Sequence, residues 1–256
     1  MKHLLAGWTY AVMAFLYLPI VLLAVYSFNN SPLSILWSGF TLRWYAVVWH
    51  DSLLIGAIEN SLLIATAATV ISVILGTLAA WLLYRYKFPG TAATYTLLVT
   101  PMIIPEVIMG VSLMLFFRAI GMELGFVTVI IAHVTFCFPF VMAAVQARLA
   151  GLDPAMEEAA MDLGATPARA FFRVILPYLT PGIIAGAMLA FTLSLDEFVV
   201  TYFTYDARSM TLPVRIYTAI HGAGARPALN AVSTLFIVAT AILVVASDAI
   251  RRKPKQ

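Results

Sequence analysis

The polar stretch EEAAMDLGATPARAFFRVILP, residues 157–177, interrupts a sequence that is otherwise apolar over long runs. Across all 256 residues, 62% are hydrophobic and 11% are charged, and the mean hydropathy is +0.97. Soluble domains carry about 25% charged residues, so lipid must be the solvent for much of this chain's surface. The sequence therefore predicts an all-α polytopic membrane protein in which one polar segment leaves the membrane.

Six apolar runs are long enough to cross about 30 Å of hydrocarbon as helices. We expect them at residues 9–28, 60–84, 95–117, 124–147, 179–203 and 228–250. The first run resembles a secretory signal, but at about twenty residues without a clean cleavage site it is interpreted as a retained anchor helix. We divide the chain into 1–58, an N-terminal helix with an outward-facing segment, 59–248, the transmembrane domain, and 249–256, a basic tail.

The distribution of Lys and Arg predicts the orientation of these spans. Six spans put both termini on one side of the membrane. That side, with the loops 85–94 and 148–178, holds ten of the fifteen Lys and Arg residues. The positive-inside rule therefore predicts that both termini and the polar stretch are cytoplasmic.

The polar stretch is predicted to form two short helices. Asp153 can cap a first helix over residues 153–163, and Gly164 can end that helix because glycine adopts the left-handed conformation. A second helix is expected from Thr166-Pro167, a capping residue followed by proline, to Pro177.

One face of the first of these helices is small and smooth. Ala159, Ala160 and Leu163 form it, and Glu158 and Asp162, four residues apart, give it a polar edge. This face could receive another protein. The alternative is an amphipathic helix on the membrane surface, which an acidic helix suits poorly because the inner leaflet is anionic.

Glu158-Ala159-Ala160, then Gly164 and Leu176-Pro177, resembles the E-A-A-x3-G-x9-I-x-L-P signature of ABC importer permeases, with Val174 in place of Ile. The resemblance implies the type I ABC importer transmembrane fold. It also implies that this segment is the coupling helix, which sits in a groove of an ATP-binding subunit. The implied coupling residues are Glu158, Ala159, Ala160, Gly164, Leu176 and Pro177.

The chain itself contains no G-x-x-x-x-G-K-[ST] phosphate-binding loop. We therefore expect ATP and Mg²⁺ to bind a separate ATPase subunit, and this chain to be a transport subunit, not an enzyme, with no cofactor of its own.

Three acidic residues lie well inside the predicted spans, away from their ends, where charge is costly and therefore suggests function. Glu106, in TPMIIPEVIMG, follows Pro101 and Pro105, which should kink the helix and open it toward a cavity. Asp196 and Glu197 are adjacent, so on a helix they point about 100° apart. We expect one of them to face the path and the other to find a partner or the rim. The alternative is that these acids are protonated or are paired across a subunit contact.

Aromatic residues gather in the predicted outward loops, where most would form an interfacial belt and a few could contact an ammonium group through their rings. Acids at depth with aromatics at the mouth favour an elongated polycation over an anion. His133 and Cys137 have no ligand-spaced partners and are interpreted as a packed neutral imidazole and a buried thiol. The aromatic residues are Trp37, Phe40, Trp44, Tyr45, Trp49, Tyr202, Phe203 and Tyr205.

Several further stretches, which together cover most of the chain, resemble the second permease subunit of spermidine/putrescine importers. These are YLPIVLLAVYSFNNS, GFTLRWYAVV, LYRYKFPG, HVTFCFPFV, MDLGATPARAFFRVILP and LSLDEFVVTYF. The resemblance implies a bacterial inner-membrane protein that pairs with a homologous second permease, two copies of an ABC ATPase subunit and a periplasmic polyamine-binding protein. No nucleic-acid partner is expected.

The same resemblance assigns a polyamine-path role to Glu106 and Asp196. Many relatives have two aspartates where this chain has Asp196-Glu197, so the preferred polyamine stays open.

Two other functions are compatible with parts of this pattern. The same importer architecture could carry another small cation or a carboxylated metabolite. An ATP-independent secondary transporter or channel would instead leave the polar hairpin without a purpose. A membrane-embedded enzyme is disfavoured, because the sequence has neither metal-spaced ligands nor a G-x-S-x-G nucleophile elbow.

Overall fold

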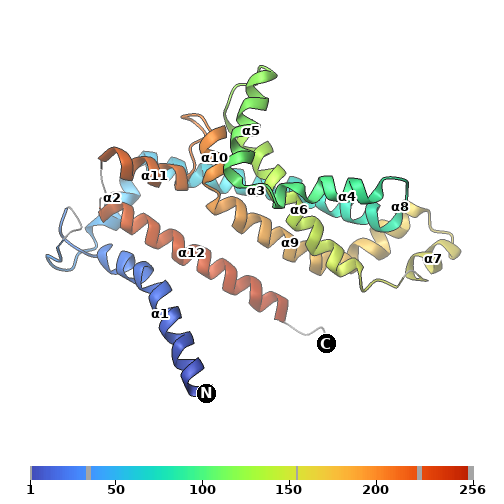
Figure 1. Ribbon diagram of the computed structural model, residues 1–256, viewed down its shortest axis with the longest axis horizontal. Helices are drawn as coiled ribbons and strands as arrows, with labels where there is room; N and C mark the ends of the chain where they lie inside the picture. The colour runs from blue at the N-terminus through green and yellow to red at the C-terminus, as the bar shows by residue number, and fades with distance from the viewer. Residues whose placement is uncertain (1, 33–35, 154, 224–226, 253–256) are drawn as a thin grey trace. The chain divides into compact units, whose positions relative to one another are not determined.

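The computed structural model describes residues 2–32, 36–153, 155–223 and 227–252, and these residues are mostly helical (Figure 1). They contain no β-strand, only an isolated bridge between Asn29 and Phe40. The predicted all-α class is therefore confirmed. The helices are α1 Lys2–Tyr26, α2 Arg43–His50, α3 Ser52–Arg85, α4 Thr91–Val99, η1 Thr100–Met102, α5 Glu106–Ala119, α6 Phe126–Leu149, α7 Ala155–Asp162, α8 Pro167–Ala170, η2 Phe171–Ile175, α9 Leu176–Asp196, α10 Val199–Thr204, α11 Leu212–Ala223 and α12 Pro227–Arg252.

Four described helices are long and apolar enough to cross a membrane, and a fifth span results if the bent pair α4–η1 and α5 is counted as one. The four are Leu5–Tyr26, Ser52–Arg85, Phe126–Leu149 and Pro167–Asp196. In α12, the described apolar segment Pro227–Ile242 is shorter than a membrane span. The polytopic character is thus confirmed, whereas the count of six stays a prediction. The predicted chain divisions also stay predictions, and residues 253–256 of the basic tail lie outside the described residues.

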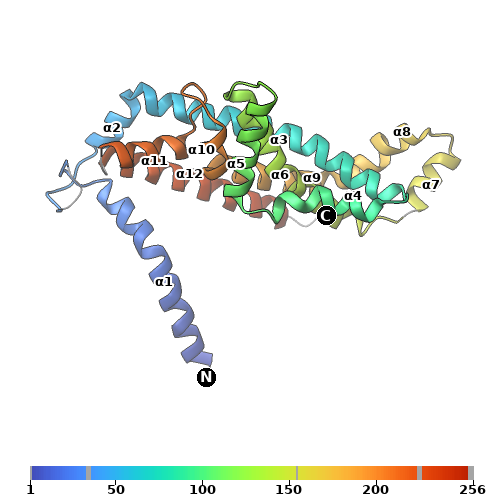
Figure 2. The same cartoon turned by 45° about the horizontal axis from the view of Figure 1, so that its top comes forward.

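The chain forms two compact units. The first consists of Met1–Ile58 and Leu212–Ile242, and the second of Glu59–Thr211 and Leu243–Gln256. In the first unit, buried residues of α2, the start of α3, α11 and α12 form a small core: Val48, Leu54, Leu212, Ala231 and Val232. Helix α1 of this unit has no buried residue in its most apolar window, and Figure 2 shows it standing away from α2 and α11. That helix is left to contact lipid or another subunit.

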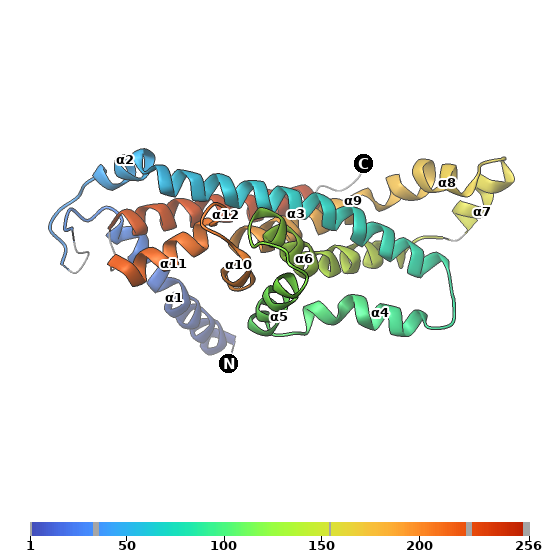
Figure 3. The same ribbon diagram turned by 90° about the horizontal axis from the view of Figure 1, so that it is seen from above.

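The second unit is built around α6, which packs along α9 and also contacts α3 (Figure 3). Small residues permit these close approaches. A Cβ on Gly76 of α3 would lie 2.9 Å from the backbone oxygen of Phe138, and one on Gly186 of α9 would lie 3.1 Å from Cα of Val141. Such contacts between small residues are typical of helix packing in membranes, where van der Waals contact replaces the hydrophobic drive.

Two of the predicted spans are broken. The expected helix 95–117 is instead α4–η1 and α5, which meet at an angle of 104°. The predicted kink at Pro101 and Pro105 is confirmed, and the bend is sharp because each proline removes a backbone donor. The expected helix 179–203 is wrong in its second half, because α9 ends at Asp196 and a short helix, α10, begins at Val199. Asp196 and Glu197 therefore lie at a helix break and not on one continuous helix.

The polar hairpin, residues 153–177, contains the predicted first helix, but its second helix differs from the prediction. Asp153 caps α7 by accepting a hydrogen bond from the Ala155 backbone N–H at 2.9 Å. The expectation that the second helix ends at Pro177 is wrong, since the helical path continues from Pro167 to Asp196. The turn Phe171–Ile175 is a π-helix in which Leu176 N–H donates to Phe171 O, five residues back. This wider turn accommodates Pro177, which has no N–H and would clash with a regular α-helical turn.

Candidate functional site

The break between α9 and α10 separates the two adjacent acids. Asp196 is the last residue of α9 and its side chain is exposed. Glu197 has extended backbone angles and is only 5% exposed, and its Oε1 accepts a hydrogen bond from Val200 N–H at 2.8 Å. Glu197 thus satisfies the start of α10, where a helix favours negative charge. The structure leaves Asp196 as the member of the pair that is open to a ligand.

Glu106 begins α5 and is exposed, directly after Pro105 at the other helix break. Helix α5 packs against α10 so closely that a Cβ on Gly110 would lie 2.7 Å from Cδ2 of Phe203. Glu106 lies one turn before Gly110, near enough to Asp196 and Glu197 for electrostatic repulsion between the carboxylates. The two breaks therefore bring together the three acids that the sequence singled out.

No cation of the described chain neutralises this acidic cluster of Glu106, Asp196 and Glu197. Among the described residues, no Lys, Arg or His lies within 4.0 Å of these carboxylates, and no group of three potential ligands could hold a metal ion. Asp196 also sits at the C-terminal end of α9, where the helix dipole disfavours an anion. An incoming cation would relieve both kinds of repulsion.

Aromatic rings follow the acids along α10. Tyr202 packs against Phe198 at 5.5 Å between ring centroids, against Phe203 at 5.8 Å and against Tyr205 at 6.1 Å. These rings offer faces on which ammonium groups can rest. Two other predicted aromatics instead fix the first loop, since Trp44 Nε1–H donates to Asn29 O at 2.7 Å and Tyr45 Oη lies 2.7 Å from Ser27 Oγ. The remaining three, Trp37, Phe40 and Trp49, are exposed.

A buried polar network holds the α9–α10 break in place. His133 of α6 is fully buried, with Nδ1 2.7 Å from Ser194 Oγ and Nε2 2.7 Å from Thr201 Oγ1. Thr201 Oγ1 donates to Glu197 O at 3.0 Å, so it accepts from Nε2–H, and Nδ1 accepts from Ser194. The packed neutral imidazole expected from the sequence is thus fully paired. Its partners, 61 and 68 residues away, carried no sequence signal.

The predicted coupling residues lie mainly on the outer surface of the polar hairpin. Glu158 and Ala159 are exposed, Ala160 is partly buried, and Leu163 is 90% exposed. Gly164 has φ +87°, the left-handed conformation predicted for it. Pro177 is exposed and Leu176 is half-buried. The face is therefore smooth, apolar and open.

The inner surface of the hairpin contains a contact that sequence reasoning missed. Glu157 is 8% exposed, and its Oε1 lies 2.9 Å from Nε of Arg85 at the end of α3. Nothing in the sequence separates Glu157 from the neighbouring Glu158, whereas the structure turns the first inward and the second outward. Only the roughly 100° rotation per helical residue hinted at this division.

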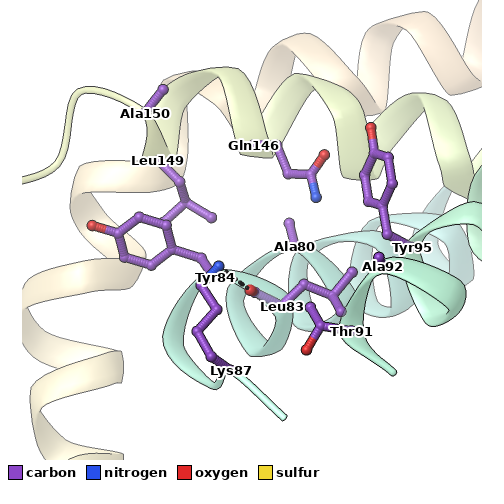
Figure 4. Close-up of a pocket in the computed structure, with 10 residues that line it drawn as sticks. All are labelled: Ala80, Leu83, Tyr84, Lys87, Thr91, Ala92, Tyr95, Gln146, Leu149 and Ala150. Atoms are coloured by element: carbon purple, nitrogen blue, oxygen red, sulfur yellow. Dashed lines mark hydrogen bonds between the residues drawn. The ribbon is translucent and has the colours of Figure 1, made fainter. Parts of the chain in front are cut away.

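A pocket of about 520 Å³ lies at the neighbouring ends of α3, α4 and α6 (Figure 4). Its lining carries one charge, that of Lys87, whose ammonium donates to Leu83 O at 3.2 Å. A cationic, largely apolar lining does not suit a polycation, so this pocket is not a candidate for the acidic path. The lining residues are Ala80, Leu83, Tyr84, Lys87, Thr91, Ala92, Tyr95, Gln146, Leu149 and Ala150.

Comparison with known proteins places the chain in a transport family. Residues 72–253 match the family model described as "Binding-protein-dependent transport system inner membrane component". The chain is 39% identical over 251 residues to the spermidine/putrescine transport system permease protein PotC of Escherichia coli (strain K12), covering 98% of this chain and 95% of the relative. It is also 40% identical over 247 residues to the putrescine transport system permease protein PotI of the same strain, covering 94% and 86%.

The fold is similar to that of solved ABC transporters. A chain of a bacterial ABC transporter involved in the import of the acidic polysaccharide alginate superposes with a TM-score of 0.76 at 18% identity, over 100% of this chain and 96% of that one. This likeness concerns the fold alone, and it confirms the fold class predicted from the sequence.

Proposed function

The chain belongs to the family of binding-protein-dependent transport system inner membrane components, and from this premise we propose that it is a permease subunit of an ATP-driven polyamine importer. In this proposal it forms half of the translocation path for spermidine or putrescine across the bacterial inner membrane. The names of two relatives, a spermidine/putrescine permease and a putrescine permease at 39% and 40% identity, support this cargo.

The observation that carries the proposal is the acidic cluster at two helix breaks. Glu106 and Asp196 are exposed and lack a cationic partner among the described residues. Polyamines are flexible chains of ammonium groups, and each ammonium can pair with one carboxylate while the methylene segments lie against Tyr202 and its neighbouring rings. In this proposal Glu106 and Asp196 bind the cargo directly, whereas Glu197 adds charge and fixes α10.

The coupling hairpin is proposed to bind a separate ATPase subunit. Its outer face, with Glu158, Ala159, Ala160 and Leu163, offers an apolar surface with an acidic edge. Gly164 allows the sharp turn after α7, and Leu176-Pro177 leads from the hairpin into α9. ATP and Mg²⁺ bind the ATPase, and closure of the ATPase shifts the hairpin and switches the path between two states.

The proposed assembly contains a homologous second permease, two copies of the ATPase and a periplasmic polyamine-binding protein. Both termini of this chain are cytoplasmic, as the excess of Lys and Arg on that side indicates. ATP hydrolysis belongs to the partner subunit, so the chain acts as a transport subunit and not as an enzyme.

Two measurements on the assembled complex in liposomes test the proposal. Glu106→Gln and Asp196→Asn should each lower spermidine-stimulated ATP hydrolysis, whereas Glu123→Gln, an exposed acid outside the cluster, should not. A crosslinker on Ala160→Cys should capture the ATPase, and the native Cys137 will not interfere because it is buried.

Unchanged stimulation in both acid variants would exclude the polyamine path and favour another cargo. Failure of the residue-160 crosslink, or transport that survives removal of the ATPase, would instead overturn the ATP-driven mechanism and favour a secondary transporter.

A further inference from the structure

The coupling hairpin is attached to helix α3 by its inner surface. The Arg85–Glu157 ion pair, at 2.9 Å, is the only ion pair among the described residues. Glu157 is largely buried, whereas the Arg85 side chain keeps 38% of its surface exposed. Because the next residue, Glu158, faces outward, two successive glutamates divide the helix into one face for a partner and one for the spans.

Two further contacts accompany the ion pair along the same end of α3. The ring of Trp81 packs against Phe171 of the hairpin at 5.5 Å between centroids, and Tyr84 Oη lies 3.5 Å from Leu152 O. Trp81 belongs to the buried core of this unit, and Phe171 packs against that core. Trp81 and Arg85 at this end of α3 therefore contact the hairpin, and Tyr84 contacts the chain just before it.

Helices α6 and α9, which flank the hairpin in the chain, contact each other at its base. Arg148 Nε–H donates to Tyr178 O at 3.2 Å, with its guanidinium 4.2 Å from the Tyr178 ring, and Tyr178 Oη donates to Gly151 O at 2.7 Å. Both α6 and α9 are also joined to the hairpin covalently through the chain. Helix α3 has no such chain connection, so a displacement of the hairpin can reach α3 only through non-covalent contacts.

We propose that Arg85 and Glu157 form the contact through which movement of the coupling hairpin is passed to α3. The inference rests on the proposed function, because it assumes that an ATPase moves the hairpin. Arg85 and Glu157 are positioning residues in this role and touch neither polyamine nor nucleotide. Without the ion pair, the ATPase still hydrolyses ATP, but fewer of its cycles move the transmembrane helices.

An ion pair suits this role better than the neighbouring ring contact. The Trp81–Phe171 contact is worth only about 0.5–1.5 kcal/mol beyond the area it buries, and an aromatic pair has more than one favourable arrangement. The Nε–H of Arg85 points along a fixed direction of the planar guanidinium, and a hydrogen bond between charged groups is about twice as strong as a neutral one. The pair therefore fixes the register of the hairpin on α3, which ring packing alone leaves loose.

Charge reversal in the full complex tests this inference. In liposomes with the second permease, ATPase and binding protein, the measured quantity is the number of ATP molecules hydrolysed per polyamine imported. Arg85→Glu and Glu157→Arg should each raise this ratio about fivefold to tenfold, at the lower end of typical coupling factors. The double variant R85E/E157R restores opposite charges and should return the ratio to within about twofold of wild type.

Lys87 provides a matched control, because it is a cation two residues from Arg85 whose ammonium, within the described part of the chain, donates to the Leu83 carbonyl alone. Lys87→Glu should leave the ratio unchanged, and K87E/E157R should not rescue the Glu157→Arg defect. If the reversed charges impair assembly, Arg85→Lys and Glu157→Gln replace them: Lys keeps the charge but lacks the directed Nε–H and should lose part of the coupling, whereas Gln loses the charge and should lose most of it.

Three outcomes would overturn the inference: wild-type ratios in both single variants, a double variant no better than either single one, or an equal defect from Lys87→Glu. A loss of thermal stability with an unchanged ratio would show a merely structural role and would also contradict it. These results are distinct from failure of the proposed function, which the residue-160 crosslink reports in the same preparations.

Discussion

Asp196 and Glu197 are adjacent in the chain, but their carboxylates have opposite environments. Asp196 is exposed at the end of α9, whereas Glu197 is buried and accepts the Val200 N–H at 2.8 Å. Their separation arises from the helix break between them, because a residue in extended conformation turns the chain before α10 begins. Two acids of the same charge are therefore expected to differ in function.

Asp196→Asn should weaken polyamine binding while Glu197→Gln should not. Loss of the exposed carboxylate removes one ion pair with the cargo, so the spermidine concentration for half-maximal transport should rise about tenfold, or about 1.4 kcal/mol. Glutamine at 197 keeps an oxygen that accepts from Val200, so its effect should stay within about twofold. Concentration-dependent uptake into liposomes measures both, and an equal defect in the two variants would show that exposure does not separate their functions.

Replacement of His133 by leucine should destabilise the protein strongly. In the variant, the buried Ser194 hydroxyl loses its His133 partner and the buried Thr201 hydroxyl loses one of its two partners. Each unsatisfied buried group costs about 1–3 kcal/mol. The triple variant H133L/S194A/T201V should be less affected, because it removes the orphaned hydroxyl groups together with the imidazole. Thermal denaturation in detergent tests this order, with the exposed His221→Leu as control. A triple variant less stable than H133L would contradict the network.

Gly76→Ala should lower thermal stability, whereas Gly56→Ala in the same helix should not. A Cβ added at residue 76 would lie 2.9 Å from backbone atoms of α6. A Cβ added at residue 56 would have no heavy atom of a neighbouring element within 4 Å. Overpacking costs about 1–3 kcal/mol, and alanine in an uncrowded helix gains up to about 1 kcal/mol over glycine. Melting curves of the two variants should shift in opposite directions. A stabilised Gly76→Ala protein would show that α3 and α6 are not in close contact.

The loop after α10 should show a pH-dependent stability. Burial acts to raise the pKa of Asp206, but hydrogen bonds from Ser209 and from the Arg208 backbone outweigh burial and lower the pKa below its ordinary value. The pKa of this carboxyl is about 3.9 in the unfolded chain and lower in the folded protein. The ionised carboxylate therefore stabilises the fold at any pH above about 3.9, and this stabilisation is lost as the pH falls through the pKa of the folded protein.

Asp206→Asn keeps the acceptor oxygen but cannot titrate. The melting temperature of wild type should therefore exceed that of the variant near neutral pH, and the difference should shrink as the pH falls below about 4. Other carboxylates titrate alike in both proteins, so only the difference between the two curves counts. A constant difference over the whole range would contradict the Ser209 contacts as its cause.

Much of this molecule could be predicted because its signals are local. The apolar runs predicted the spans, Pro101 and Pro105 predicted the break before Glu106, and Gly164 predicted the left-handed turn of the hairpin. Each rests on a property of one residue or one short run, such as a missing N–H or a missing Cβ. The resemblance to ABC importer permeases was confirmed through the family match and the close relatives.

The features that could not be predicted depend on distant residues. The break after Asp196 has no proline or glycine beside it. It is held by His133 of α6, which bonds Ser194 before the break and Thr201 after it. Glu157 and Arg85 are 72 residues apart, so nothing in the sequence marked them as a pair. The expected helix end at Pro177 is wrong for the opposite reason: its local helix-breaking signal is accommodated by a π-helical turn.

The uninterrupted helical path from Pro167 to Asp196 has a mechanical consequence. These 30 residues form a stiff rod about 45 Å long at about 1.5 Å per residue. One end of the rod carries the hairpin and the other ends in an exposed carboxylate. In the proposed mechanism, a tilt imposed on the hairpin would be carried along this helical path to Asp196 at its far end.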